Sequence, residues 1–219
     1  MRIFLVGQGF FAAQVAGELT VAGHRVLGAA SPRLRDGHND KEDPRSWDRL
    51  RAWAHRAAAN WTDSTVLRPD EVPEDTELIV AAHAHAFIGA AARRRARVAA
   101  IGYHPSLLPL HRGRDAVRWT VRDRDRVTGG TVYHLTDRVD AGPVAAQEHV
   151  LVPPTVTARG LWRDLLAPLG VRLLLRVADD LANGVRIEEP QDESLATWEP
   201  AMSVPPLARD LTVVGPTRR

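Results

Sequence analysis

The sequence contains no cysteine, a single lysine (Lys41) and only 5% aromatic residues. Without cysteine, the protein can form no disulfide bond, no thiolate nucleophile and no cysteine-ligated zinc site. No stretch approaches the roughly 20 consecutive apolar residues that cross a bilayer. A strand-like run begins at Met1 itself, where a signal peptide would have a basic leader. We therefore expect a cytoplasmic protein that does not associate with membranes.

Neither sign of charge is in large excess. The 29 Lys and Arg residues and the 27 Asp and Glu residues give a formal net charge of +2, too little to coat a polyanion by net charge. Four arginines cluster within residues 93–97. Because no aromatic residue interleaves with them, we interpret the cluster as a solvated helix face and expect no nucleic-acid partner.

Short apolar runs alternate with segments of helical periodicity. With 44% hydrophobic residues, the 219-residue chain can bury one sizeable core. The apolar runs predict strands at residues 2–6, 25–30, 78–82, 98–103, 131–135 and 144–152. Helices are predicted at residues 10–22, 44–60, 88–96, 116–122 and 156–183, the last with a kink at residues 168–170. Polar loops are predicted at residues 33–43, 104–114 and 137–142.

This alternation predicts an α/β fold with an open, mostly parallel, Rossmann-like sheet. We assign residues 1–189 to one domain and residues 190–219 to an irregular, proline-containing C-terminal tail, which we expect to wrap the surface or to contact a partner. The sequence leaves a homodimer open. Trp198 in the tail could lie on the rim of the site or at a dimer contact, but we favour a tryptophan that covers the core. In sheets of this class, ligands bind beyond the carboxyl ends of the strands.

The first predicted strand ends in a G-x-G-x-x-A pattern that opens a helix. The pattern reads Gly7-Gln8-Gly9-Phe10-Phe11-Ala12. Such glycines can bring helix N–H groups close to a phosphate. A dinucleotide site also needs an acidic residue at the end of the second strand, and that strand has none. Arg33 could instead accept a 2′-phosphate, as in an NADP-dependent oxidoreductase; a tight structural turn is the alternative that we favour.

His83 and His85 are two residues apart at the end of a predicted strand, so their rings fall on one face. They could form part of a metal site, with His104 or Asp140 as a third ligand. Because no established metal-ligand spacing accompanies them, we predict no metal site.

The loop after the strand at residues 98–103 carries the richest chemistry. It reads Tyr103-His104-Pro105-Ser106-Leu107-Leu108-Pro109 and then His111-Arg112-Gly113, and a later turn reads Val139-Asp140-Ala141-Gly142-Pro143. Pro105 restricts the backbone next to His104, and Asp140 lies in a turn that ends in proline. A histidine and a carboxylate at neighbouring strand ends can polarise a carbonyl and move a proton. An ordinary buried ion pair is the alternative.

Together, the two motifs resemble the formyltransferase family that uses 10-formyltetrahydrofolate as formyl donor. Within the family, the strongest likeness is to the N-terminal hydrolase-like domain of formyltetrahydrofolate dehydrogenase, and it covers residues 1 to about 184. It includes Gly7-Gln8, the motif from His104 to Pro109, and Trp119-Thr120. The resemblance implies the formyltransferase fold, with 10-formyltetrahydrofolate as cofactor and no dinucleotide at the Gly7 turn.

The resemblance also implies a role for each matching residue. His104 would polarise the formyl oxygen and stabilise the oxyanion of a tetrahedral intermediate. Asp140 would hold His104 and relay the proton from the attacking amine to the leaving nitrogen of the folate. The cofactor-binding residues would come from two loops: Phe87, Ile88, Val139, Ala141 and Gly142.

One position departs from the family pattern. Formyltransferases carry an asparagine, which donates to the oxyanion, two residues before the motif histidine, where this sequence has Gly102. Such a donor is worth about 2.7–4 kcal/mol of the barrier. The hydrolase-like domain of the dehydrogenase also lacks the asparagine. Gly102 could leave room for a water, a bulky acceptor, or a donor such as Ser106 or His85, and Arg112 is a further substrate-side candidate.

The resemblance implies an enzyme that transfers a formyl group to an amine, or a hydroxylamine, of a small-molecule acceptor. The apolar residues after Gly9 argue against glycinamide ribonucleotide, whose phosphate binds a polar loop there in the family. No tRNA-gripping barrel follows in this sequence, so we expect no tRNA substrate. The alternatives are a 10-formyltetrahydrofolate hydrolase, with water as acceptor, and a non-catalytic folate-binding relative.

Overall fold

The computed structural model describes residues 1–32 and 48–202. These residues divide into two compact units: the first contains the described part of residues 1–103 and residues 174–186, and the second contains residues 104–173 and the described part of residues 187–219. The predicted loop at residues 33–43, with Arg33, and the first residues of the helix predicted at 44–60 lie outside the described residues.

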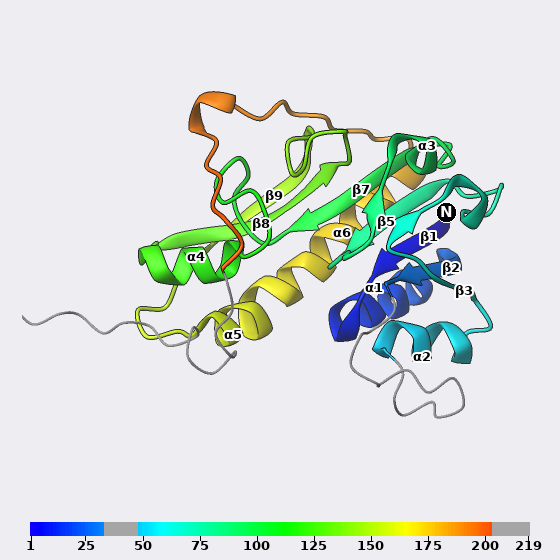
Figure 1. Cartoon of the computed structure of the whole chain (residues 1–219), viewed down its shortest axis with the longest axis horizontal. Helices are drawn as coiled ribbons and strands as arrows, with labels where there is room; N and C mark the ends of the chain where they lie inside the picture. Colours follow the sequence, from blue (N-terminus) through cyan, green and yellow to red (C-terminus); the bar gives the residue numbers. More distant parts are fainter. Residues whose placement is uncertain (33–47, 203–219) are drawn as a thin grey trace, which may run out of the picture. The chain divides into compact units, whose positions relative to one another are not determined.

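Parallel strands form the centre of the first unit (Figure 1). Leu5 of the first strand, for example, lies opposite Ala29 on one side and Val80 on the other. The middle strands are almost wholly buried, as expected for a sheet covered on both faces. In spatial order the strands are β3 (Asn60–Asp63), β2 (Arg25–Ser31), β1 (Arg2–Gly7), β5 (Leu78–Ala82) and β7 (Ala99–His104).

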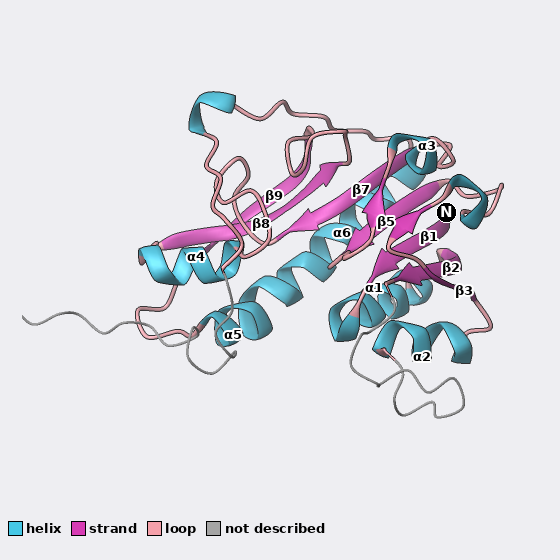
Figure 2. Ribbon diagram, viewed as in Figure 1, coloured by secondary structure: helices cyan, strands magenta, loops and turns pink. Residues whose placement is uncertain are grey.

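Two helices of the first unit, α1 (Gly9–Val21) and α2 (Arg49–Arg56), lie side by side (Figure 2). The buried stripe of α1 recurs every four residues, at Phe11, Val15 and Leu19, as the sequence pattern predicted. The helix predicted at residues 44–60 extends too far, because its last residue, Asn60, already belongs to the edge strand β3.

The second unit is built around an antiparallel pair, β8 (Val127–His134) and β9 (Val144–Leu151), in which Tyr133 lies opposite Val144. Helix α4 (Ala116–Asp123) precedes β8. Across the described residues, the larger sheet has the strand order β3-β2-β1-β5-β7-β8-β9. The predicted α/β fold with an open, mostly parallel sheet is therefore confirmed.

Two predicted helices are interrupted in the structure. The segment predicted as a helix at residues 88–96 is helical only in α3 (Ala90–Arg93). Its first residue belongs instead to the short strand β6 (Phe87–Ile88), which pairs with β4 (Val66–Leu67). The short helical turn η2 (Pro69–Glu71) follows β4 in the chain. The helix predicted at 156–183 is α5 (Ala158–Leu161), a π-helical turn η3 (Trp162–Leu166) and α6 (Ala167–Ala182). Pro168 has no N–H for the carbonyl of Asp164, so regular bonding fails just before the expected kink.

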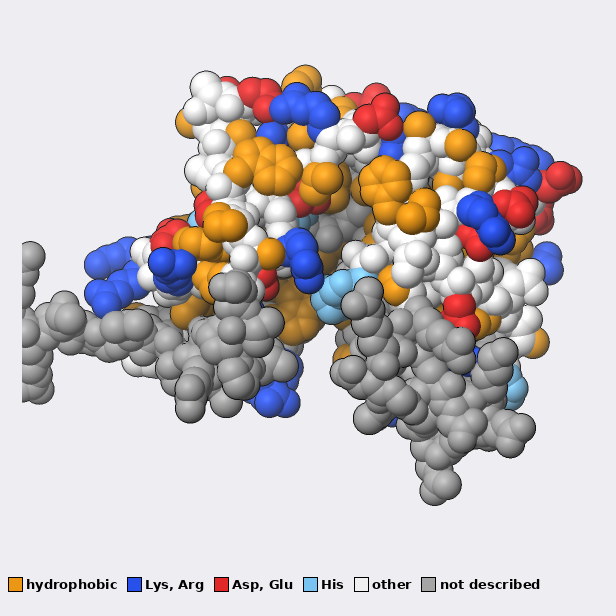
Figure 3. Space-filling view, in the orientation of Figure 1, with side chains coloured by type: hydrophobic (Ala, Val, Ile, Leu, Met, Phe, Trp, Pro, Cys, Tyr) orange, Lys and Arg blue, Asp and Glu red, His pale blue; other side chains and the backbone are white. Residues whose placement is uncertain are grey.

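The extended segment after α6, residues 187–202, belongs to the second unit and contains one short helical turn, η4 (Glu193–Leu195). Glu189 pairs with Val144, and Trp198 forms a bridge with Arg112. Trp198 is 55% exposed, so at most part of its ring can cover the core. Among the described helices none is long and apolar enough to span a bilayer. On the face shown in Figure 3, side chains of both charges are interspersed.

Candidate active site

Hydrogen bonds within the loop that follows β7, and from a residue of β8, hold this loop in place. His104 is the last residue of β7 and is buried. The buried Ser106 donates its hydroxyl hydrogen bond to the carbonyl of Leu110, and the hydroxyl of Thr131 on β8 donates to the carbonyl of Ser106. The Ser106 hydroxyl, predicted as an oxyanion candidate, therefore holds the loop in this structure.

The His104 ring contacts the protein through both nitrogens. Its Nε2 lies 2.7 Å from the backbone carbonyl of His111, and its Nδ1 lies 3.6 Å from Oδ2 of Asp140. The two side chains are 7% and 11% exposed, so the pair is almost fully buried. A separation of 3.6 Å is too long for a hydrogen bond. The carbonyl of His111, rather than Asp140, fixes the orientation of the ring.

This geometry constrains where the proton lies. A carbonyl can only accept, so Nε2 must carry a hydrogen that it donates to His111. In a neutral ring Nδ1 would then present a lone pair to the carboxylate of Asp140, and two acceptors would face each other. The arrangement is favourable when Nδ1 is also protonated or when a donor lies between Nδ1 and Oδ2. A group that donates a proton could therefore bind between Nδ1 of His104 and Oδ2 of Asp140.

Two elements hold the Asp140 carboxylate. The Tyr133 hydroxyl on β8 donates to Oδ1 at 2.6 Å, and the Gly113 N–H donates to Oδ2 at 2.8 Å. Burial and the negative charge of Asp140 raise the pKa of Tyr133 well above its usual value, so its phenol remains a donor at neutral pH. Both hydrogen bonds stabilise the negative charge of the carboxylate.

The turn from Val139 to Gly142 lies close against β8. A Cβ on Gly142 would lie 1.7 Å from the carbonyl oxygen of His134, so only glycine fits there. Gly142 is buried, Ala141 is half-buried, and Val139 is 56% exposed. Of the three cofactor-binding candidates in this turn, Val139 therefore has the most exposed side chain.

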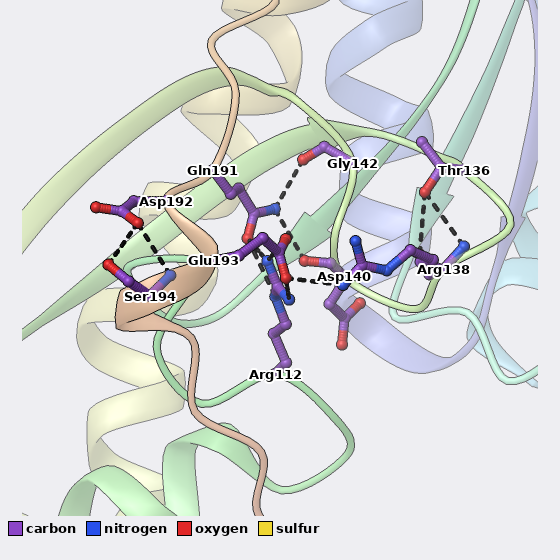
Figure 4. Close-up of polar contacts among 9 residues, drawn as sticks. All are labelled: Arg112, Thr136, Arg138, Asp140, Gly142, Gln191, Asp192, Glu193 and Ser194. Carbon is purple, nitrogen blue, oxygen red and sulfur yellow. Dashed lines mark hydrogen bonds and ion pairs between the residues drawn. The ribbon is translucent and has the colours of Figure 1, made fainter.

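Arg112 faces the segment after α6 (Figure 4), and the neighbouring His111 contacts Glu199 of that segment. The His111 ring lies between two carboxylates, with Nε2 2.8 Å from Asp125 and Nδ1 3.0 Å from Glu199. The guanidinium of Arg112 is fully buried and pairs with Glu193 at 2.8 Å. Arg112, predicted as a substrate-side candidate, thus contacts the extended segment of its own chain.

The remaining candidates lie in the first unit. Gly102 is buried in β7 opposite Ala81. The Nε2 atoms of His83 and His85 lie 3.3 Å apart. Desolvation of its imidazole ring lowers the pKa of His83. In the described part of the chain, no group of three His, Cys, Asp or Glu residues could hold a metal ion.

The two pterin candidates of the first unit differ in exposure. Phe87 is 59% exposed, whereas the next residue, Ile88, is buried. Phe87 is therefore the one of the two whose side chain a ligand can reach.

The glycine turn after β1 is occupied by the chain itself. The Gly9 N–H donates to Oδ2 of Asp48 at 2.8 Å, and the other oxygen of Asp48 accepts from Leu50. A Cβ on Gly7 would lie 2.2 Å from the carbonyl oxygen of Ala82, so this glycine is needed for strand packing. The Asp48 carboxylate thus accepts the hydrogen bond of the N–H that a phosphate would need. This supports the interpretation of the Gly7–Gly9 segment as a structural turn.

Sequence reasoning missed three residues that support the His104–Asp140 pair. Tyr133 carried a signal, because a buried tyrosine usually finds a partner for its hydroxyl. Gln191 and Glu193 carried none, because their contacts join segments about 50 residues or more apart in the chain.

Taken together, these features define an α/β protein whose strand β7 ends in an enclosed histidine–carboxylate pair suited to proton transfer. Solved structures share the fold. An N-formyltransferase from Helicobacter canadensis superposes with a TM-score of 0.70 at 14% identity, over 90% of this chain and 70% of that one. Glycinamide ribonucleotide transformylase 1 from Symbiobacterium toebii gives a TM-score of 0.68 at 21% identity, over 88% and 94% of the two chains.

Sequence comparison identifies the family. Residues 55–177, more than half of the chain, match the sequence profile described as Formyl transferase. The chain therefore belongs to the formyl transferase family, as its motifs predicted. It is 29% identical over 207 residues to the mitochondrial 10-formyltetrahydrofolate dehydrogenase of Mus musculus, and 32% identical over 207 residues to a methionyl-tRNA formyltransferase of Chloroflexus aurantiacus. These matches span about 90% of this chain but only 22% and 64% of those proteins.

Proposed function

We propose that this protein transfers a formyl group from 10-formyltetrahydrofolate to an amine, or a hydroxylamine, of a small-molecule acceptor. The observation that carries the proposal is the enclosed pair of His104 Nδ1 and Asp140 Oδ2, 3.6 Å apart, in a chain of this family. The Helicobacter canadensis N-formyltransferase is described in complex with folinic acid and dTDP-3-aminofucose, a reduced folate and an amino sugar, which supports a folate donor paired with an amine acceptor.

In this proposal the two side chains divide the proton chemistry. With Nε2 bonded to the His111 carbonyl, His104 presents Nδ1 to the reaction. A protonated His104 would donate Nδ1–H to the formyl oxygen and stabilise the negative charge that develops there. Asp140 would take the proton of the attacking amine on Oδ2 and return it to the leaving nitrogen. Tyr133 and the Gly113 N–H keep the carboxylate in place throughout.

The formyl donor supplies the one-carbon group, and we assign its contacts to residues that a ligand can reach. In the second unit, the exposed Val139 side chain and the backbone of Ala141 and Gly142 lie next to the buried Asp140. Phe87, which is exposed, and Ile88, which is buried, stay a prediction as pterin-binding residues. The pterin ring has the flat apolar surface that such side chains bind.

The first experiment follows release of tetrahydrofolate and formate from 10-formyltetrahydrofolate, without an amine and then with a panel of amines and hydroxylamines. His104→Ala should lower turnover by about 10²–10⁴-fold, while a stable folate analogue should still raise the melting temperature of the variant. His149→Ala, which removes an exposed histidine on β9, is the matched control and should retain full activity. An unchanged rate in His104→Ala would overturn the proposal.

A 10-formyltetrahydrofolate hydrolase is the second candidate function. It is favoured by Gly102, which leaves the oxyanion-donor position of the family without a side chain, and by the relatives described as 10-formyltetrahydrofolate dehydrogenases. Rapid release of formate without any amine would support the hydrolase. Binding of the folate analogue with no turnover toward any acceptor would instead support a non-catalytic relative.

The Gly102→Asn variant separates these functions further. If the transferase proposal is right, the new side chain occupies space next to His104 that the acceptor uses, and transfer to the preferred amine falls. A large gain of activity would favour the hydrolase or a degenerate site, because it would mean that the protein lacks only the oxyanion donor.

A further inference from the structure

Gln191 connects the extended segment after α6 to the turn that carries Asp140. Its side-chain amide donates two hydrogen bonds, to the backbone carbonyl of Asp140 at 2.9 Å and to that of Gly142 at 2.7 Å (Figure 4). Its Oε1 accepts two from Arg112, at 2.7 Å from Nη2 and 3.2 Å from Nε. Both amide hydrogens and both acceptor sites are thus used, so the amide has one orientation in which it satisfies every partner.

The partner of this amide is anchored in turn. The Arg112 side chain is fully buried and binds Glu193 through two nitrogens, at 2.8 and 3.1 Å. Arg138 binds the same carboxylate at 2.7 Å. The two arginines lower the pKa of Glu193 to about 2, so its carboxylate is charged at neutral pH. Glu193 therefore joins the loop after β7, through Arg112, to the Asp140 turn, through Arg138.

The Asp140 turn needs such support. Asp140 has a φ of 50°, the left-handed conformation that non-glycine residues seldom adopt. Its backbone position decides where the carboxylate lies relative to Nδ1 of His104, 3.6 Å away. On one side the carboxylate is held by Tyr133 and the Gly113 N–H. The backbone carbonyls on the other side of the turn are held by Gln191.

We infer that Gln191 is a positioning residue for the formyl-transfer reaction, which acts by fixing the backbone of Asp140 so that its carboxylate faces His104. The inference rests on the proposed function. It also extends the working site beyond residues 55–177, the part that matches the family profile. The segment after α6 is then a part of the active site that completes it from a distant point in the sequence.

The test compares the kinetics of Gln191→Met with those of wild type in the formate-release or transfer assay. Methionine keeps the length of the side chain but offers no amide hydrogens to the two carbonyls. Because a displacement of about 1 Å can cost about 10²-fold in rate, we expect kcat to fall about 10–100-fold. A folate analogue should still raise the melting temperature, and the KM for the folate should change by a smaller factor than kcat. The pH dependence of kcat should also change, since a purely structural role would leave it unaltered.

Ser194→Ala is the matched control, because it removes an exposed hydrogen bond to Asp192 in the same segment without touching the Asp140 turn. It should match wild type in kcat and in pH profile. Wild-type kcat and pH profile in Gln191→Met would overturn the inference while the proposed function stood. A wild-type enzyme with no formyl release and no transfer would instead refute the proposed function itself.

Gln191→Glu provides a second arm that does not depend on the stability of the methionine variant. The new carboxylate can still accept from Arg112, but at neutral pH it presents oxygens to the carbonyls of Asp140 and Gly142. We expect kcat to fall at least as far as in Gln191→Met. Full activity in Gln191→Glu would show that the two carbonyl contacts do not matter and would overturn the inference.

Discussion

The hydroxyl of Tyr133 donates a 2.6 Å hydrogen bond to Oδ1 of Asp140, and this contact lies in the interior of the second unit. It places a strand residue of β8 directly behind the carboxylate that faces His104. The Gly113 N–H approaches the same carboxylate from the loop after β7. A carboxylate held by two separate elements cannot rotate freely, which is the property that a proton-transfer group needs.

Tyr133→Phe should destabilise the protein because it removes one donor from a buried carboxylate. A hydrogen bond to a charged group contributes about 1.5–3 kcal/mol, and we expect a loss of that size in the free energy of unfolding measured with urea. The same variant should lower kcat. If neither the free energy of unfolding nor kcat changes measurably, the position of Asp140 does not depend on this contact.

The titration of Tyr133 gives an independent check. Burial, together with the charge of Asp140, raises the pKa of its phenol well above 10. A group whose pKa is raised on folding stabilises the native state below its unfolded pKa, and this stabilisation is lost as the pH rises further. Tyrosinate absorbance should therefore show one component that appears only at very alkaline pH or on unfolding. That component should be missing in Tyr133→Phe.

Asp140→Asn should remove the acceptor for the proton of the attacking group. We expect kcat to fall about 10²–10⁴-fold, with a folate analogue still raising the melting temperature. Asp123→Asn, at the exposed end of α4, removes a carboxylate from the same unit and should be neutral. Equal activity of Asp140→Asn and Asp123→Asn would show that Asp140 takes no part in the chemistry.

The strands that were predicted best from the sequence are those that consist of a continuous apolar run. Residues 78–82 form an unbroken apolar run, and β5 has the predicted bounds. By contrast, β3 contains the polar residues Asn60 and Asp63 and lies at the edge of the sheet. It is a strand because it pairs with β2, and its sequence has no apolar pattern that would predict one. Edge strands of this kind carry too little hydrophobic signal to be separated from a loop or a helix end.

The candidate site divides in the same way. His104 and Asp140 belong to motifs with recognisable spacing, and the structure brings them within 3.6 Å. Arg112 was predicted on the substrate side, but its guanidinium is buried against Gln191 and Glu193. Those contacts come from an irregular segment whose path follows from tertiary packing, and no local pattern in the sequence encodes that path.

Glu193→Gln should change stability in a pH-dependent way. In the native state Arg112 and Arg138 lower the pKa of Glu193 from 4.5 to about 2. A lowered pKa stabilises the native state above the unfolded pKa, and the contribution is lost as the pH falls through the native value. The melting temperature of wild type should therefore exceed that of Glu193→Gln above pH 4.5, and the difference should shrink toward pH 2. Because Glu193 is half-exposed, salt should reduce the difference. A difference that is constant from pH 7 to pH 2 would contradict this role of the ion pair.

Gly142→Ala should be among the most destabilising single substitutions near the site. The added methyl would lie 1.7 Å from the carbonyl oxygen of His134, a backbone atom that cannot move aside without shifting β8. We expect a loss of about 3 kcal/mol or more in the free energy of unfolding. Gly184→Ala is the matched control: Gly184 has a φ of 77°, but a Cβ there meets no atom within 4 Å, so the cost should be only about 1 kcal/mol of backbone strain. Similar losses in the two variants would mean that the Asp140 turn can move away from β8, and the carboxylate would then not be held in the position that formyl transfer requires.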